Sequence, residues 1–236
     1  MKTLNFVLNF FGKIYCNRKS KKEFLNRKFK WINERPIEYQ FVFKALTSLY
    51  PKTILDVGTG TTALPHLLSN CGFLVTAIDN IYDYWPKGMF NRHYHIIQDD
   101  IIKSKLKVKF DFITCISVLE HIRKNDDAIK NIFNLLKDKG HIVLTFPYNE
   151  NKYIQNVYLH AEAGYGKSLP YICQIYSRND LNRWLKMNNG KIIKQEYWQV
   201  FSGKYWTFGD HLSPPIQVNK ENEHHLTCVL IQKKEE

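Results

Sequence analysis

Three aspartates follow one another at the ends of short apolar runs, and they are the first sign of chemistry in this 236-residue sequence. Asp56 lies two residues before Gly58, Asp79 ends the run Thr-Ala-Ile-Asp, and Asp100 follows a third run. If these runs are parallel strands, their carboxyl ends share one edge of a sheet. Carboxylates grouped there suit a ligand that carries a cation and several hydrogen-bond donors.

The glycines at 58 and 60 admit two interpretations. Glycine allows a tight turn and a close approach of ligand to the next helix, and Gly58-x-Gly60-x-x-Ala63 satisfies the dinucleotide fingerprint. An NAD-dependent oxidoreductase is therefore the competing class. Asp56 separates the two, because its carboxylate repels a pyrophosphate but attracts the α-ammonium and sulfonium of S-adenosylmethionine. We therefore favour S-adenosylmethionine as the cofactor.

The two later carboxylates fit the rest of such a nucleoside. Asp79 lies about 20 residues beyond the glycines, the position from which a carboxylate accepts hydrogen bonds from ribose hydroxyls in either cofactor class. Asp99 and Asp100 are adjacent, and either can accept from an adenine amino group. We favour Asp100 of the pair.

Five ordered motifs carry a resemblance to a known family. They are Asp-x-Gly-x-Gly at 56–60, Ala-Ile-Asp at 77–79, Gln-Asp-Asp at 98–100, Ser-Val-Leu-Glu-His at 117–121 and Leu-Leu-Lys-Asp-Lys-Gly at 135–140. Together, over residues 36–148, they resemble the class I S-adenosylmethionine-dependent methyltransferases. Within that family the chain is most similar to the group that includes ubiquinone-pathway and small-molecule or sugar O- and N-methyltransferases.

The resemblance implies a role for each position that matches a motif. The methionine part of the cofactor is expected beside the glycine loop, the ribose beside Asp79, the adenine beside Asp100, and the activated methyl after the fourth strand. The cofactor-binding residues expected on this basis are Asp56, Gly58, Thr59, Gly60, Thr61, Asp79, Asn80, Asp100, Ile101, Ile116 and Ser117.

The candidates for a catalytic base are Glu120, His121 and His211. The first two follow the strand expected closest to the methyl, where similar sugar O-methyltransferases place a histidine base. His211 lies in a later insertion that is expected to cover the pocket, as do His160 and Asp210 in their insertions. A base is useful when the acceptor is a hydroxyl.

Strands and helices are expected to alternate around these residues. Strands are predicted at 53–57, 73–78, 94–98, 110–116, 141–146, 191–200 and 225–233, and helices at 36–50, 62–70, 118–136 and from Ser177 to about 189. This pattern predicts a doubly wound, mostly parallel seven-stranded sheet, the Rossmann-like methyltransferase fold. The resemblance adds a C-terminal antiparallel hairpin.

The basic residues gather at the start of the chain. Residues 1–35 hold ten Lys or Arg against two Glu, so this arm carries +8 of the net +12. We expect a basic N-terminal arm, 1–35, followed by one methyltransferase domain, 36–236, with insertions near 149–176 and 201–224. The arm can attract an anionic acceptor, an RNA or an anionic membrane, or it can simply be solvated.

The expected function is methyl transfer to a polar small molecule, with O-methylation of a sugar, nucleotide-linked sugar or glycan precursor preferred. The alternatives are an RNA methyltransferase that uses the basic arm and the NAD-dependent oxidoreductase. Ser117-Val118-Leu119 in place of Asn/Asp-Pro-Pro-Tyr argues against methylation of a nucleic-acid base. The five cysteines are scattered without a Cys-x-x-Cys pair, which predicts a cytoplasmic protein and no metal site.

Overall fold

The computed structural model describes residues 2–26, 33–80 and 94–235, and the chain divides into two compact units, Met1–Asn33 and Glu34–Glu236. The described part of the first unit is one helix, α1 (Lys2–Asn26). The sequence analysis assigned no structure to this arm, and its basic residues Arg27, Lys28 and Lys30 lie outside the described residues.

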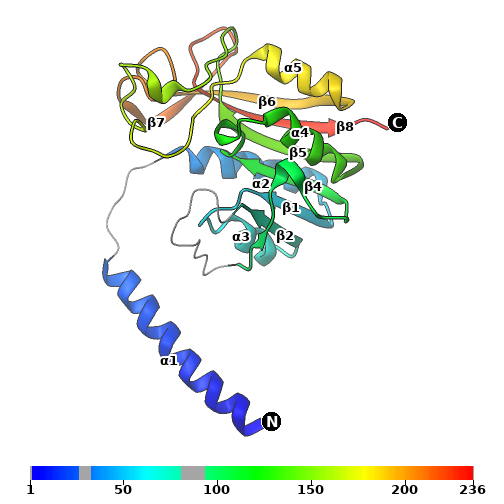
Figure 1. Ribbon diagram of the computed structural model, residues 1–236, viewed down its shortest axis with the longest axis vertical. Helices are drawn as coiled ribbons and strands as arrows, with labels where there is room; N and C mark the ends of the chain where they lie inside the picture. Colours follow the sequence, from blue (N-terminus) through cyan, green and yellow to red (C-terminus); the bar gives the residue numbers. More distant parts are fainter. Residues whose placement is uncertain (1, 27–32, 81–93, 236) are drawn as a thin grey trace. The chain divides into compact units, whose positions relative to one another are not determined.

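The second unit is an α/β sheet structure that confirms the expected fold class (Figure 1). The strands lie in the order β3-β2-β1-β4-β5-β8-β6-β7. Their bounds are β1 (Thr53–Val57), β2 (Leu74–Asp79), β3 (Ile97–Gln98), β4 (Phe110–Ile116), β5 (Leu136–Pro147), β6 (Gly190–Phe201), β7 (His211–Val218) and β8 (Leu226–Lys233).

The first five strands run parallel to one another, whereas β8 runs antiparallel between β5 and β6. The expected antiparallel pair is thus β6 and β8. The sheet has eight strands rather than seven because the insertion between them contributes β7, an edge strand paired with β6. Pro214 and Pro215 suit an edge strand, where a missing N–H breaks no ladder.

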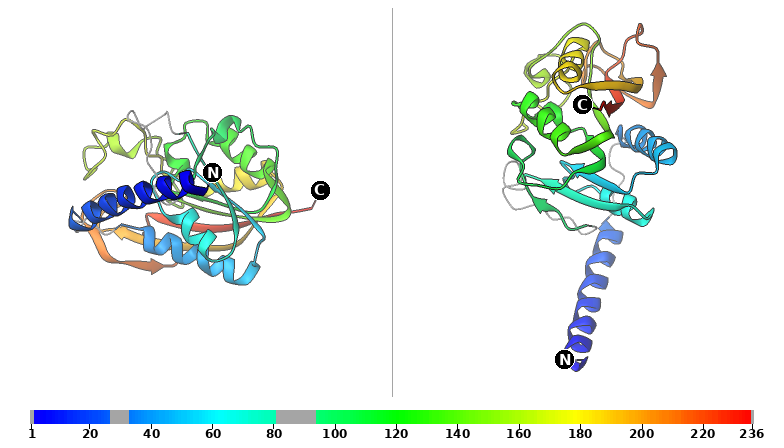
Figure 2. Two further views of the ribbon diagram at one scale, coloured as in Figure 1. Left: turned by 90° about the horizontal axis from the view of Figure 1, so that it is seen from below. Right: turned by 90° about the vertical axis from the view of Figure 1, so that its right-hand side faces the viewer.

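Helices cover both faces of this sheet, as the views in Figure 2 show. Alternate strand residues point to opposite faces: Ile54 and Phe112 pack with α2 (Arg35–Leu49) and α3 (Leu64–Asn70), whereas Leu55 and Ile113 pack with α4 (Asn125–Asn134) and α5 (Arg178–Met187). Because both faces are buried, the strands read as continuous apolar runs in the sequence.

Two predicted elements differ from the structure. The helix expected over 118–136 is a short 3-10 turn, η2 (Leu119–His121), followed by α4, because Ile122 is extended and Leu136 already belongs to β5. The strand expected at 94–98 is reduced to Ile97–Gln98. The remaining 3-10 turns are η1 (Ile101–Lys103) and η3 (Val157–Leu159).

Helix α5 begins after Ser177, where the sequence predicts the start of a helix. The Asp180 carboxylate accepts the Ser177 backbone N–H at 2.9 Å and the Ser177 hydroxyl at 2.6 Å. Replacing Asp180 by Ala should lower the free energy of unfolding by about 1–2 kcal/mol, because two donors at a helix start lose their acceptor. Urea denaturation measures this. The control Asp127→Ala, exposed in the first turn of α4, should change it by less than about 0.5 kcal/mol.

Candidate active site

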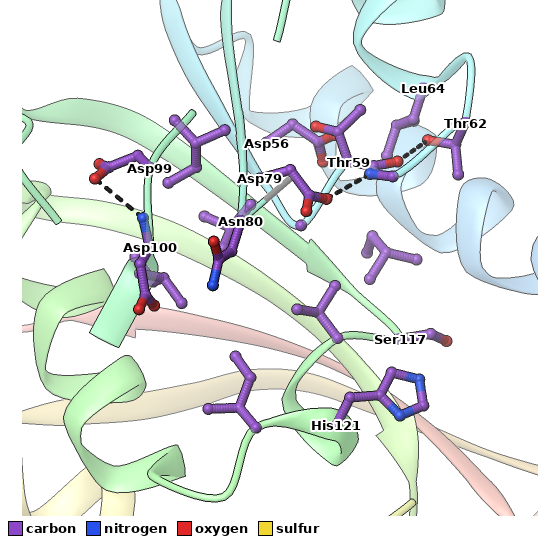
Figure 3. Close-up of a pocket in the computed structure, with 18 of the residues that line it drawn as sticks. Asp56, Thr59, Thr62, Leu64, Asp79, Asn80, Asp99, Asp100, Ser117 and His121 are labelled. Atoms are coloured by element: carbon purple, nitrogen blue, oxygen red, sulfur yellow. Dashed lines mark hydrogen bonds between the residues drawn. The ribbon is translucent and has the colours of Figure 1, made fainter. Parts of the chain in front are cut away.

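One cavity of about 540 Å³ lies at the carboxyl ends of β1, β2 and β4 (Figure 3). Its wall holds every cofactor-binding residue expected from the sequence: Asp56, Gly58, Thr59, Gly60, Thr61, Asp79, Asn80, Asp100, Ile101, Ile116 and Ser117. The structure therefore brings together residues that are up to 61 positions apart in the chain. Their individual roles remain predictions.

Asp56 is a buried carboxylate held by two hydroxyls. Its side chain accepts hydrogen bonds from Thr114 at 2.6 Å and from Thr59 at 2.7 Å. Burial raises the pKa of Asp56 to about 6, although the two threonine hydroxyls lower it. The carboxylate is therefore held in a fixed orientation at the cavity wall by two neutral hydroxyls, an environment that a cationic group nearby would stabilise.

The two glycines of the loop meet different constraints. Gly58 has φ +71°, and a Cβ there would lie 2.4 Å from a methyl group of Val118. Gly60 has φ +58°, and a Cβ there would meet open space. Gly58 is thus required by the protein's own packing, whereas Gly60 keeps the backbone bare on the side of the cavity.

Four backbone N–H groups of this loop already have acceptors inside the protein. Gly58 and Thr59 donate to the Ile78 carbonyl, Gly60 to Asp79, and Thr62 to the Thr59 carbonyl. A dinucleotide site needs such amides turned toward a pyrophosphate. Their internal use argues against the NAD interpretation and leaves carboxylates and hydroxyls as the polar groups of this wall.

The structure separates the two adjacent acids after β3. Asp99 is buried and accepts from the Ser104 hydroxyl at 2.6 Å and from the Lys105 backbone N–H, so it holds its own loop. Asp100 is half-buried and caps η1 through a bond from the Ile102 N–H to one of its oxygens. Both line the cavity, and the fixed role of Asp99 supports the preference for Asp100 as a ligand contact.

Sequence reasoning missed a buried ion pair beside the cavity. Glu38 of α2 is fully buried and accepts from the hydroxyls of Ser117 at 2.6 Å and Thr145 at 2.5 Å. Its second oxygen accepts from the Arg35 guanidinium at 2.6 Å, and Arg35 lines the cavity. Burial acts to lower the pKa of Arg35, but the carboxylates of Glu38 and Glu34 raise it above its usual value. This places a permanent cation at the cavity wall.

A signal for this pair was present in the sequence. Glu38 shares one helical face with Phe41, Val42 and Ala45, which are all buried. A charged residue on an apolar face is a buried charge that needs a partner.

His121 is the one predicted catalytic residue that lines the cavity. Its Nδ1 lies 2.7 Å from the Ile172 carbonyl oxygen, and its ring packs edge-on against Tyr171 at 4.5 Å between centroids. Burial lowers the pKa of His121, although the Ile172 carbonyl raises it. The imidazole is therefore mostly neutral at pH 7, with its proton on Nδ1 donated to the Ile172 carbonyl.

Glu120 does not line the cavity, and its carboxyl group lies beside Nε2 of this imidazole. It is 3% exposed, and one of its oxygens is 3.8 Å from Nε2 of His121. Its other oxygen has no hydrogen-bond partner within the part of the chain that the structure describes. Burial raises the pKa of Glu120 to about 8, so this carboxyl group is mostly protonated at neutral pH.

The other candidate bases lie elsewhere. His211 is on β7 with its ring 5.4 Å from that of Phe201, and it does not line the cavity. His160 packs against Phe208, and Asp210 also lies outside the cavity wall. The insertion over 149–176 instead reaches the cavity through Tyr171, a contact that aromatic composition alone could not single out.

Comparison with known proteins places the chain in a family. The family described as "Methyltransferase domain" matches residues 26–195, which is more than half of the chain. The chain belongs to this family. The prediction of a class I S-adenosylmethionine-dependent methyltransferase is confirmed at this level, and with it the expected cofactor, S-adenosylmethionine.

Curated relatives of this methyltransferase domain include two named "Ubiquinone biosynthesis O-methyltransferase". The protein from Glaesserella parasuis is 30% identical over 116 residues, 44% of this chain and 49% of that protein. The protein from Dechloromonas aromatica is 29% identical over 179 residues, 70% of this chain and 75% of that protein. The chain spans about half the length of the first curated relatives that it matches.

Solved structures share the fold. Magnesium protoporphyrin IX methyltransferase from Synechocystis, with S-adenosylhomocysteine bound, is 14% identical with a TM-score of 0.54, and the match covers 98% of this chain and 99% of that chain. The N1-methyltransferase of 1,6-didemethyltoxoflavin from Burkholderia thailandensis is 13% identical with a TM-score of 0.54, covering 85% and 78%. In the described residues of the methyltransferase chain, no helix is long and apolar enough to cross a membrane.

Replacing Asp79 by Ala should weaken S-adenosylhomocysteine binding by about ten- to a hundredfold. The change removes a carboxylate at the ribose position together with the acceptor of the Gly60 N–H, 2.7 Å away. Calorimetric titration measures the affinity, and Asp138→Ala, exposed at the opposite end of the sheet, is the control. Unchanged affinity would remove Asp79 from the ribose role.

Replacing Glu120 by Gln should make the stability of the protein less dependent on pH. The folded-state pKa of about 8 exceeds the ordinary 4.5, so the stability contributed by the protonated group is complete below pH 4.5 and lost as pH rises through 8. We expect parent and variant to unfold alike at pH 5, and the variant to be more stable by about 2–4 kcal/mol at pH 8.5. The free energy of unfolding of parent and variant is measured by urea denaturation across this pH range. If it changes with pH in the same way for both proteins, the raised pKa of Glu120 is contradicted.

Proposed function

We propose that the protein transfers the methyl group of S-adenosylmethionine to a hydroxyl oxygen of a small acceptor, with His121 as the general base. The observation that carries this proposal is the imidazole at the cavity wall, with its Nδ1 held 2.7 Å from the Ile172 carbonyl oxygen, so that Nε2 is the ring atom that would act as the base. Two relatives named O-methyltransferases support transfer to oxygen.

The cavity wall fits this cofactor. Asp56 and the Arg35 guanidinium suit the ammonium and carboxylate of its methionine part, Asp79 the ribose, and Asp100 with Ile101 the adenine. Ile116 and Ser117 would flank the methyl. The cofactor supplies an electrophilic methyl on a sulfonium leaving group. The chain's task is to align the acceptor oxygen in line with that methyl and to exclude competing water.

Ser117 is well placed for this alignment because its conformation is fixed. It has φ +51°, its hydroxyl donates to Glu38, and its N–H donates to Thr145. A non-glycine residue in this conformation is strained and persists where its surroundings determine it. The turn after β4 therefore presents a rigid wall between the glycine loop and His121.

The lowered pKa of His121 bears on the acceptor. A weaker base removes a proton most readily from an acidic hydroxyl, and a phenolic hydroxyl is far more acidic than that of an alcohol. Tyr171 adds an aromatic surface beside the imidazole. These two observations favour an aromatic hydroxyl, in the direction of the ubiquinone-pathway relatives. The sugar-type acceptor preferred from the sequence is the second candidate.

The remaining sequence-based proposals concern the setting. An anionic acceptor is supported by Arg123 and Lys124 in the cavity wall. A cytoplasmic location is supported by the cysteines, because Cys115, Cys173 and Cys228 are buried and free. An RNA acceptor remains the alternative that would use the basic arm.

A screen with S-adenosylmethionine and two acceptor classes tests the proposed reaction. Catechol and 3,4-dihydroxybenzoate represent aromatic hydroxyls, and UDP-glucose represents sugar hydroxyls. We expect S-adenosylhomocysteine to form with the aromatic pair and the product to be an aryl methyl ether by mass spectrometry. Turnover of UDP-glucose alone would favour the sugar acceptor, and methylated nitrogen in an amine screen would contradict O-methylation.

Replacing His121 by Gln should lower kcat by about 10²–10⁴-fold and leave cofactor affinity within about threefold. The parent enzyme should lose activity as pH falls, on an acid limb that lies below the ordinary histidine pKa of 6.5, and this limb should vanish in the variant. His141→Gln, a half-buried histidine of β5 outside the cavity wall, is the control. An unchanged pH profile in His121→Gln would exclude it as the base.

A further inference from the structure

Helix α1 exposes a row of large apolar side chains. Leu4, Leu8 and Phe11 are 62%, 60% and 63% exposed, and Phe6 and Phe10 are 72% and 53% exposed. Leu4, Val7, Leu8, Phe11, Ile14 and Tyr15 recur at intervals of three and four residues and so share one face of the helix. An exposed apolar surface of this kind marks a site of contact with an apolar partner.

Basic residues follow directly after these apolar turns. Lys13 and the cluster Arg18, Lys19, Lys21 and Lys22 belong to the same helix, and the segment up to residue 35 carries only two acids. The helix is thus apolar in its first half and cationic in its second. The two halves together restrict what can cover it.

One class of partner satisfies both halves. A second copy of α1 could pack on the apolar turns but would bring two cationic ends close together. A nucleic acid would neutralise the cationic end but leave the phenylalanines in water. An anionic lipid bilayer accepts the apolar side chains among its acyl chains and the lysines and arginine among its phosphates.

The dimensions fit attachment to one leaflet. The apolar segment from Leu4 to Tyr15 is about 17 Å long at the α-helical rise, well short of the roughly 30 Å hydrocarbon core. We therefore propose that α1 attaches the enzyme peripherally to an anionic membrane surface, with the apolar face that holds Leu4, Leu8 and Phe11 buried in the outer part of one leaflet. This inference does not depend on the proposed reaction, since the described cavity wall begins at Arg35.

Sedimentation of the full chain with vesicles tests the attachment. One set of vesicles contains phosphatidylcholine alone and the other phosphatidylcholine with phosphatidylglycerol. We expect binding to the anionic vesicles, at least about tenfold stronger than to the neutral ones, and weaker binding at high salt. Equal binding to both sets, or no binding to either, would overturn the proposal.

Two double variants separate the apolar and cationic contributions. Phe10→Gln/Phe11→Gln and Lys19→Gln/Lys22→Gln should each lower the partition coefficient by at least about tenfold. The matched controls alter exposed residues of the second unit and should bind like the parent: Leu74→Gln/Ile193→Gln and Lys52→Gln/Lys191→Gln.

Calorimetric titration with S-adenosylhomocysteine shows that the second unit of each variant, which holds all the described cavity residues, is folded. Light scattering reports the oligomeric state of parent and variants without vesicles. If the phenylalanine variant turns an oligomer into a monomer but binds vesicles as the parent does, the helix is a self-association element and the proposal fails.

Discussion

The active-site edge of the sheet depends on the hydrogen bonds and the ion pair made by the carboxylate of Glu38. It is a fully buried charge on α2 that receives hydroxyls from Ser117, after β4, and Thr145, in β5, while Arg35 neutralises it. Loss of one partner would leave a buried charge uncompensated, which is among the most destabilising changes a protein can suffer. The cluster therefore joins a helix and two strand ends at the edge of the cavity where Ser117 lies.

Much of the fold could be predicted because both faces of the sheet are buried. The strands at 53–57 and 110–116 are continuous apolar runs, and the structure has them with the expected bounds. The start of α5 after Ser177 was likewise set by a local signal. β7 was not predicted because Pro214 and Pro215 are unfavourable residues in a strand. The break at Ile122 between η2 and α4 is set by tertiary packing instead of local helix preference.

The candidate site likewise contains residues that the sequence could predict and residues that only the tertiary structure brings to the cavity. Residues at strand ends, such as Asp56 and Asp79, were predictable because their position along a strand determines where they meet. Tyr171 reaches the cavity from an irregular insertion, where no period of the sequence sets the direction of a side chain. Arg35 reaches it from the first residue of α2, before the apolar repeat of that helix begins. His211 lies in the insertion that was expected to cover the cavity, but it does not line the cavity. It belongs to β7, and the pairing of β7 with β6 could not be read from the sequence.

The bond from His121 to the Ile172 carbonyl joins the two halves of the chain in one functional unit. Most of the cavity wall comes from residues 35–124, whereas the carbonyl that orients the imidazole and the ring that packs edge-on against it both belong to the insertion over 149–176. A change in this short segment would therefore shift the imidazole at the cavity wall and leave the glycine loop and the strand-end carboxylates in place.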